Sequence, residues 1–136
     1  MGLAEGVDVD IVVPVLLIVM GIAMAAIWTR DILRGEQVDL SAGFFAARDP
    51  EAGTLFWPHW FAEYATAILL VVGGIGLFSD GAWGPVVAAI GTGALVYTST
   101  NSLGWAFSRR ERWPYAVPML SGVVLGIAST VFLLLR

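Results

Sequence analysis

Four long apolar stretches dominate this sequence, and each is about as long as a helix must be to cross the hydrocarbon core of a bilayer. They cover about residues 10–29, 58–78, 85–107 and 114–135. Hydrophobic residues make up 58% of the chain and charged residues 13%, whereas a soluble domain carries about 25% charged residues. The sequence therefore predicts an all-α integral membrane protein. We expect one domain over residues 1–136, with four transmembrane helices in an up-down antiparallel bundle.

The first apolar stretch follows an acidic segment that contains Glu5, Asp8 and Asp10. A secretory signal peptide begins with positive charge instead. The stretch is also long enough to span a bilayer by itself. We therefore expect a permanent first helix, with Pro14 in its first turn, where proline is tolerated.

The connection at residues 30–56 is long and polar. Within it, residues 41–48 are typical of a short interfacial helix capped by Ser41, whose Phe44 and Phe45 would dip into the lipid boundary. An irregular loop whose two phenylalanines pack on the bundle is the alternative. In contrast, the turn at residues 79–84 is short, so the helices on either side of it should be antiparallel neighbours.

The placement of arginine predicts the orientation, because basic residues concentrate in cytoplasmic loops. The chain has no lysine, and six of its seven arginines lie in the loops 30–56 and 108–113. We expect both loops to be cytoplasmic and both termini to face outward. The abundance of alanine, glycine and arginine indicates a prokaryotic source, so the predicted location is a prokaryotic cytoplasmic membrane.

Small residues are placed where membrane helices would pack closely. Gly21 and Ala25 form a small-xxx-small pair, and Gly122 and Gly126 form a GxxxG pattern, although chance explains such patterns in a glycine-rich chain. Glycines at similar depth in the second and third stretches predict a tight contact between these two helices. They are Gly73, Gly74 and Gly76 in the second stretch, and Gly91 and Gly93 in the third.

The segment 57–64 carries the only histidine of the chain. Pro58 suits the first position of a helix, where its missing N–H costs nothing. On that helix His59 and Glu63 are four residues apart and share a face. Trp57, Trp60 and Tyr64 are typical of the headgroup level, where amphipathic rings settle.

Glu63 and Asn101 are predicted to lie at one depth near the cytoplasmic side, on neighbouring helices. A carboxylate within a membrane needs a partner or a proton, and the run from Tyr97 to Ser102 supplies donors. Tyr115 and Pro118 should enter the same layer. The predicted binding residues are Glu63, His59, Asn101, Tyr97, Thr98, Tyr64 and Trp60. The alternatives are a structural hydrogen-bond hub at Glu63, an interfacial role for His59, and hydroxyls that bond to their own helix.

Few chemistries fit the remaining residues. The chain has no cysteine and a single histidine, so we expect no metal site, no catalytic residues and no cofactor. No basic stripe favours nucleic acid. The polar run that ends in Thr100, Asn101 and Ser102 resembles a segment of fluoride channels, but the rest of that family's pattern is missing. Overall, the helix pattern looks like small four-helix bacterial or archaeal membrane proteins of unassigned role.

Three functions follow from these features. The favoured one is a binding or accessory module, embedded in the lipid bilayer, that docks a membrane partner or a small amphipathic ligand. The second is an oligomeric transporter or channel for a small ion or solute that uses Glu63 as a protonatable group. The third is an enzyme that handles a quinone or a lipid, and the missing catalytic motifs argue against it.

Overall fold

The computed structural model describes residues 9–34, 50–79, 81–108 and 110–135, and all regular structure within them is helical. The long helices are α1 (Val9–Leu33), α2 (Pro50–Leu77), α3 (Trp83–Phe107) and α4 (Ala116–Leu135), and a 3₁₀ turn, η1 (Arg110–Tyr115), precedes α4. No strand occurs in this part of the chain. The predicted all-helical class with four long helices is therefore confirmed.

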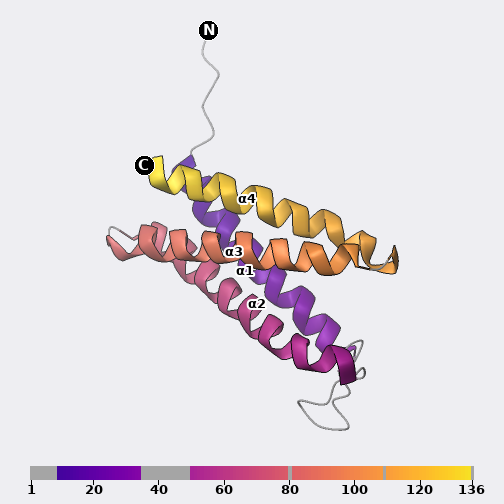
Figure 1. Ribbon diagram of the computed structural model, residues 1–136. Coiled ribbons are helices and arrows are strands. Elements are labelled where there is room, and N and C mark those ends of the chain that lie inside the picture. Colours follow the sequence, from indigo (N-terminus) through magenta and orange to yellow (C-terminus); the bar gives the residue numbers. More distant parts are fainter. Residues whose placement is uncertain (1–8, 35–49, 80, 109, 136) are drawn as a thin grey trace.

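Consecutive helices run in opposite directions, and the chain folds back at each connection (Figure 1). α2 packs against both α1 and α3, and α3 packs against both α2 and α4. Within the described residues, α1 and α4 make little contact with each other. The bundle therefore has two central helices, α2 and α3, which carry the site described below.

Three segments are long and apolar enough to cross a membrane: Val9–Leu33, Pro58–Leu77 and Arg110–Leu135. α3 is not among them, although a span was predicted at residues 85–107. Its second half contains the polar run Tyr97–Ser102, which lowers its hydropathy.

The candidate span Pro58–Leu77 agrees with the span predicted at about 58–78, but several predicted helix boundaries were wrong. Pro58 lies inside α2, which begins eight residues earlier at Pro50, so proline does open this helix but at a different position. Pro14 lies in the second turn of α1 rather than the first. α1 also continues to Leu33, so Asp31 is not in the loop but buried on the helix, with 3% of its surface exposed. The predicted interfacial helix at 41–48 lies outside the described residues.

Two of the three predicted small-residue contacts are confirmed. A methyl group added at Gly21 would lie 2.6 Å from the backbone oxygen of Ala67, so α1 and α2 approach closely there. The GxxxG pattern of α4 packs on α3, because a methyl group at Gly126 would meet Val96 at 2.8 Å and one at Gly122 would press on Ser99.

The predicted glycine contact between α2 and α3 is correct only in part. An added methyl group at Gly73 would lie 2.6 Å from Cα of Ala88, and one at Gly91 would lie 3.0 Å from the backbone of Leu69. Gly74 instead faces Pro14 and Ile18 of α1, and nothing lies within 4 Å of a methyl group at Gly93. The second helix therefore uses successive glycines to approach two different neighbours.

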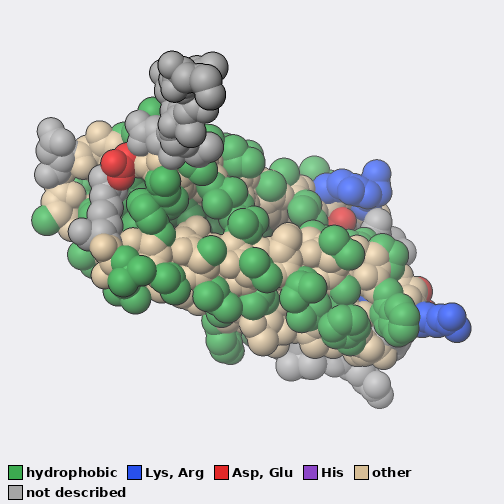
Figure 2. All heavy atoms as spheres, turned by 90° about the horizontal axis from the view of Figure 1, so that it is seen from above, with side chains coloured by type: hydrophobic (Ala, Val, Ile, Leu, Met, Phe, Trp, Pro, Cys, Tyr) green, Lys and Arg blue, Asp and Glu red, His purple; other side chains and the backbone are tan. Residues whose placement is uncertain are grey.

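Charge is confined to the ends of the bundle on the face seen in Figure 2, and hydrophobic and uncharged groups cover the length between them. The basic side chains lie at one end, where α1 and α3 terminate. There Arg112 lies over the Trp105 ring at 4.5 Å, and Tyr115 meets the edge of the same ring at 5.6 Å. This clustering of arginine with aromatic rings is typical of a membrane–water interface.

Candidate functional site

The centre of the site is the carboxylate of Glu63 on α2, which is buried with 3% of the residue exposed. The hydroxyl of Ser102 on α3 donates a hydrogen bond of 2.8 Å to its Oε1. The indole N–H of Trp28 on α1 donates a second hydrogen bond to the same side chain. Donors from both neighbouring helices therefore satisfy an acid that α2 alone could not hold in an apolar bundle.

His59 lies one helical turn before Glu63, and its Nε2 is 3.4 Å from Oε1 of that residue. The same Nε2 is 3.3 Å from Oγ of Ser102, while Nδ1 is 3.3 Å from Nδ2 of Asn101. Because the amide nitrogen of Asn101 can only donate, the neutral ring that fits these contacts carries its proton on Nε2. The edge-to-face contact with Trp28, at 5.2 Å between ring centroids, holds the imidazole in place.

A cleft of about 180 Å³ opens beside Glu63 between α1 and α4. It exists because these two helices do not close on each other over the α2–α3 pair. Most of its walls are apolar, and Glu63 and Ser99 bring polar atoms to it. Its walls include Met24, Trp28, Glu63, Ser99, Pro118 and Leu125. Pro118 therefore enters the polar layer as predicted.

The structure changes the predicted partner of Glu63. The acid accepts a hydrogen bond from Ser102, whereas Asn101 is exposed and contacts His59 instead. Asn101 was predicted because it lies at the right depth, but the next residue on the helix faces α2.

Other predicted residues lie outside the cluster. The Tyr97 side chain points away from the core and is 71% exposed. Thr98 is buried, but its hydroxyl bonds to the carbonyl of Leu95 on its own helix at 3.4 Å, as the alternative for hydroxyls anticipated. Trp60 is only 1% exposed and packs beside Trp28, so its ring faces the interior of the bundle.

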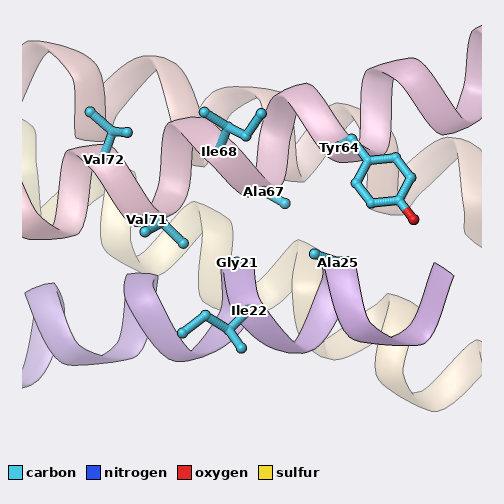
Figure 3. A pocket seen from close by; sticks show the side chains of 8 residues that line it. All are labelled: Gly21, Ile22, Ala25, Tyr64, Ala67, Ile68, Val71 and Val72. Carbon is cyan, nitrogen blue, oxygen red and sulfur yellow. The ribbon is translucent and has the colours of Figure 1, made fainter. Parts of the chain in front are cut away.

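Tyr64 belongs to a different surface, an apolar groove of about 320 Å³ between α1 and α2. Figure 3 shows its ring at one end of the groove, with the hydroxyl beyond it. That hydroxyl is 2.7 Å from Oγ1 of Thr29 on α1. The small side chains of Gly21, Ala25 and Ala67 give the groove its depth.

Two residues of the site were missed by sequence reasoning. Ser102 lies in the polar run and shares a helix face with Thr98, four residues earlier. The sequence therefore indicated which face it lies on, but not that it bonds to Glu63. Trp28 was not among the predicted binding residues. Its indole is buried, with 4% of the residue exposed, and it contacts both His59 and Glu63. This arrangement depends on how α1 crosses α2.

The cluster can present an oxygen acceptor to the cleft and can hold a proton on either of two neighbouring groups. It offers too few ligands for tight metal binding, since no three His, Asp or Glu side chains gather anywhere in the described residues. The chemistry available is hydrogen bonding and proton exchange.

A family known as a domain of unknown function, DUF8058, matches residues 9–136. The chain belongs to this family. The DUF8058 match covers all four helices and therefore the whole site. No curated protein and no solved structure matches the chain.

Proposed function

We propose that the protein is an integral membrane protein whose four helices all span the bilayer in up-down order. Three segments have the required length and apolarity, and the alternating helix directions in Figure 1 match such a path. α3 is the fourth span in this proposal. Its buried face carries Thr92, Thr98, Ser99 and Ser102, so these polar side chains are covered by the bundle rather than exposed to lipid.

The proposed orientation places the arginine end in the cytoplasm. Four arginines of the described residues lie where α1 ends and around η1, namely Arg30, Arg34, Arg110 and Arg112. Asp10, at the start of α1, belongs to the opposite end. By the positive-inside rule both chain termini then face outward. The membrane in this proposal is a prokaryotic cytoplasmic membrane, which the abundance of alanine, glycine and arginine supports.

Within that membrane we propose a binding module for a small amphipathic molecule with a hydrogen-bond donor. The observation that carries the proposal is the buried Glu63 carboxylate lining the cleft between α1 and α4. An apolar pocket with a few convergent polar groups is the usual form of a small-molecule site. Ionisable groups inside a membrane bundle are expensive and are generally functional.

The size of the cleft limits the ligand. A cavity of about 150 Å³ is enough to hold benzene, and this cleft has about 180 Å³. It therefore accommodates one ring or a short alkyl segment beside the carboxylate. A donor on the ligand, such as a hydroxyl or an amine, would bond to Glu63, and any longer tail would extend between α1 and α4 towards lipid.

The test uses a short-chain bromoalkanol as the probe, because its hydroxyl can bond to Glu63 and bromine quenches the fluorescence of Trp28 in the cleft wall. We expect saturable quenching of the protein in micelles. A bromoalkane of the same length should bind at least about tenfold more weakly, since a hydrogen bond to a charged acceptor contributes about 1.5–3 kcal/mol.

Two alanines of α1 provide a matched pair of variants. Ala23 lines the cleft, whereas Ala26 is exposed on α1 and is not among the lining residues. We expect Ala23→Leu to weaken quenching by the bromoalkanol and Ala26→Leu to leave it unchanged. If the bromoalkanol and the bromoalkane quench equally and Ala23→Leu has no effect, the quenching comes only from partition of the probes into the micelle. That outcome would refute the site.

A further inference from the structure

We infer that His59 and Ser102 carry protons between the outer surface of the α2–α3 pair and the Glu63 carboxylate in the cleft. The inference rests on the proposed function for its meaning, because it makes occupancy of the cleft depend on protons. It goes beyond ligand binding in assigning a path and a direction of access. The juxtaposition that supports it is a continuous set of contacts from an exposed side chain to the wall of the cleft.

The path begins at Asn101, which is exposed on α3, and its amide lies 3.3 Å from Nδ1 of His59. The His59 side chain is 15% exposed, whereas that of Glu63 is only 4% exposed. Nε2, on the far side of the ring, faces Oε1 of Glu63 at 3.4 Å and Oγ of Ser102 at 3.3 Å. Glu63 itself lines the cleft, so the imidazole bridges two differently exposed environments.

Each step moves one proton and breaks no bond between heavy atoms. A proton from the surface adds to Nδ1 while the Asn101 amide turns to present its oxygen as acceptor. The proton on Nε2 then passes to Oε1 of Glu63. It passes directly, or Ser102 gives its own hydroxyl proton to Oε1 and takes the one from Nε2. The carboxylate becomes a carboxylic acid, the ring keeps its proton on Nδ1, and the reverse sequence returns the proton to the surface.

The surroundings of the path contain few other ionisable groups. α3 and α4 have no charged residue. On α1, Asp31 is buried one turn beyond Trp28, and on α2 the nearest titratable neighbour is Tyr64, whose hydroxyl contacts Thr29. η1, which packs on α3, carries Arg110, Glu111 and Arg112. Among the described residues of α2 and α3 that touch Glu63, His59 is therefore the one group that can take up and release a proton near neutral pH.

The experiment measures how fast the Glu63 carboxylic acid exchanges its proton for deuterium when the reconstituted protein is flushed with D₂O. Infrared spectroscopy follows the carbonyl band, identified as the band that Glu63→Gln removes, at a pH where the acid form is visible. We expect His59→Phe, which keeps an aromatic ring against Trp28, to slow exchange by roughly a hundredfold, since positioned proton-transfer groups contribute about 10²–10⁴-fold. Ser102→Ala should slow exchange less, because the direct contact between His59 and Glu63 remains.

Thr100→Ala is the matched control. Thr100 is exposed on α3, two residues before Ser102, and its hydroxyl bonds to the carbonyl of Val96 on its own helix, so its loss should not change the exchange rate. Asn101→Leu provides a second test that remains available if His59→Phe does not fold. It alters an exposed position and covers Nδ1 of His59 with an apolar group, so it should also slow exchange. Wild-type exchange rates in the folded His59 and Asn101 variants would overturn the relay. In that case bromoalkanol quenching, measured separately, would still support the binding site. If instead His59→Phe slows exchange but the bromoalkanol does not quench, the binding site is refuted and the relay is not.

Discussion

Replacing Gly73 by alanine tests the closest contact between the two central helices. An ideal Cβ at this position would lie 2.6 Å from Cα and 2.7 Å from the backbone nitrogen of Ala88. These atoms belong to the backbone of α3, so no side chain can rotate away. The helices themselves must separate at this point.

The magnitude follows from comparison with Gly93→Ala. Nothing lies within 4 Å of a Cβ at Gly93, so that variant gains only the helix propensity of alanine, up to about 1 kcal/mol. Gly73→Ala gains the same propensity but adds the cost of overpacking, typically about 1–3 kcal/mol. The difference in unfolding free energy between the two variants should therefore be about 1–3 kcal/mol, with Gly73→Ala the less stable.

The assay is reversible unfolding in mixed micelles with increasing SDS, followed by helical circular dichroism. Both variants are glycine-to-alanine changes in helices of one protein, so effects of composition and detergent cancel. If the two unfolding free energies agree within about 0.5 kcal/mol, the usual error of additivity between distant sites, α2 and α3 are not in backbone contact at Gly73 and the packing argument is wrong.

Three further predictions concern the hydrogen bonds of Glu63, the packing of α4 on α3, and the orientation in the membrane. Glu63→Gln should keep an unfolding free energy close to that of the wild type, because the amide oxygen can still accept the hydrogen bond from Ser102. Glu63→Leu leaves the Ser102 and Trp28 donors without an acceptor and should lower the unfolding free energy by about 1–3 kcal/mol. An unaltered SDS titration for the leucine variant would contradict a structural role of Glu63. Thr130→Val removes the 2.8 Å bond from α4 to Thr92 and should destabilise the bundle by about 0.6 kcal/mol, the average for such bonds in membranes, as SDS titration would show. Because the chain has no cysteine, a membrane-impermeant maleimide should label Gly81→Cys but not Glu111→Cys in intact cells, and the reverse pattern would invert the proposed orientation.

Helices and their packing faces were largely predictable because apolarity and small residues are local properties of the sequence. Gly122 and Gly126 of α4 pack on α3 as their spacing predicted. The boundaries were less predictable, since proline was expected to open a helix at Pro58 although Pro50 opens α2. A proline can start a helix or lie within one. Which of the two occurs depends on whether the residues before the proline are also helical.

The site was predictable to within one residue on α3. Depth along a helix follows from counting 1.5 Å per residue, and this brought α3's polar run level with Glu63. The direction in which each side chain points depends on the rotation of α3 about its axis, and that rotation comes from packing against α2 and α4. Ser102 therefore occupies the place expected for Asn101. The contribution of Trp28 depends on the crossing of α1, which no local pattern specifies.

Hydropathy excludes α3 from the candidate spans, whereas burial shows that its polar side chains are covered by other helices. The difference arises from the central position of α3 in the bundle. Averaged along the helix, the polar run makes α3 less apolar than the three candidate spans. Yet Thr98, Ser99 and Ser102 are all buried, because α2 and α4 cover the face that carries them. A helix flanked on two sides can carry hydroxyls without exposing them to lipid, and the hydroxyl of Ser102 also bonds to Glu63 on α2. The polarity that removes α3 from a hydropathy-based set of spans is thus the same polarity that holds Glu63, so the acidic site and the absence of α3 from the candidate spans are two consequences of one sequence segment.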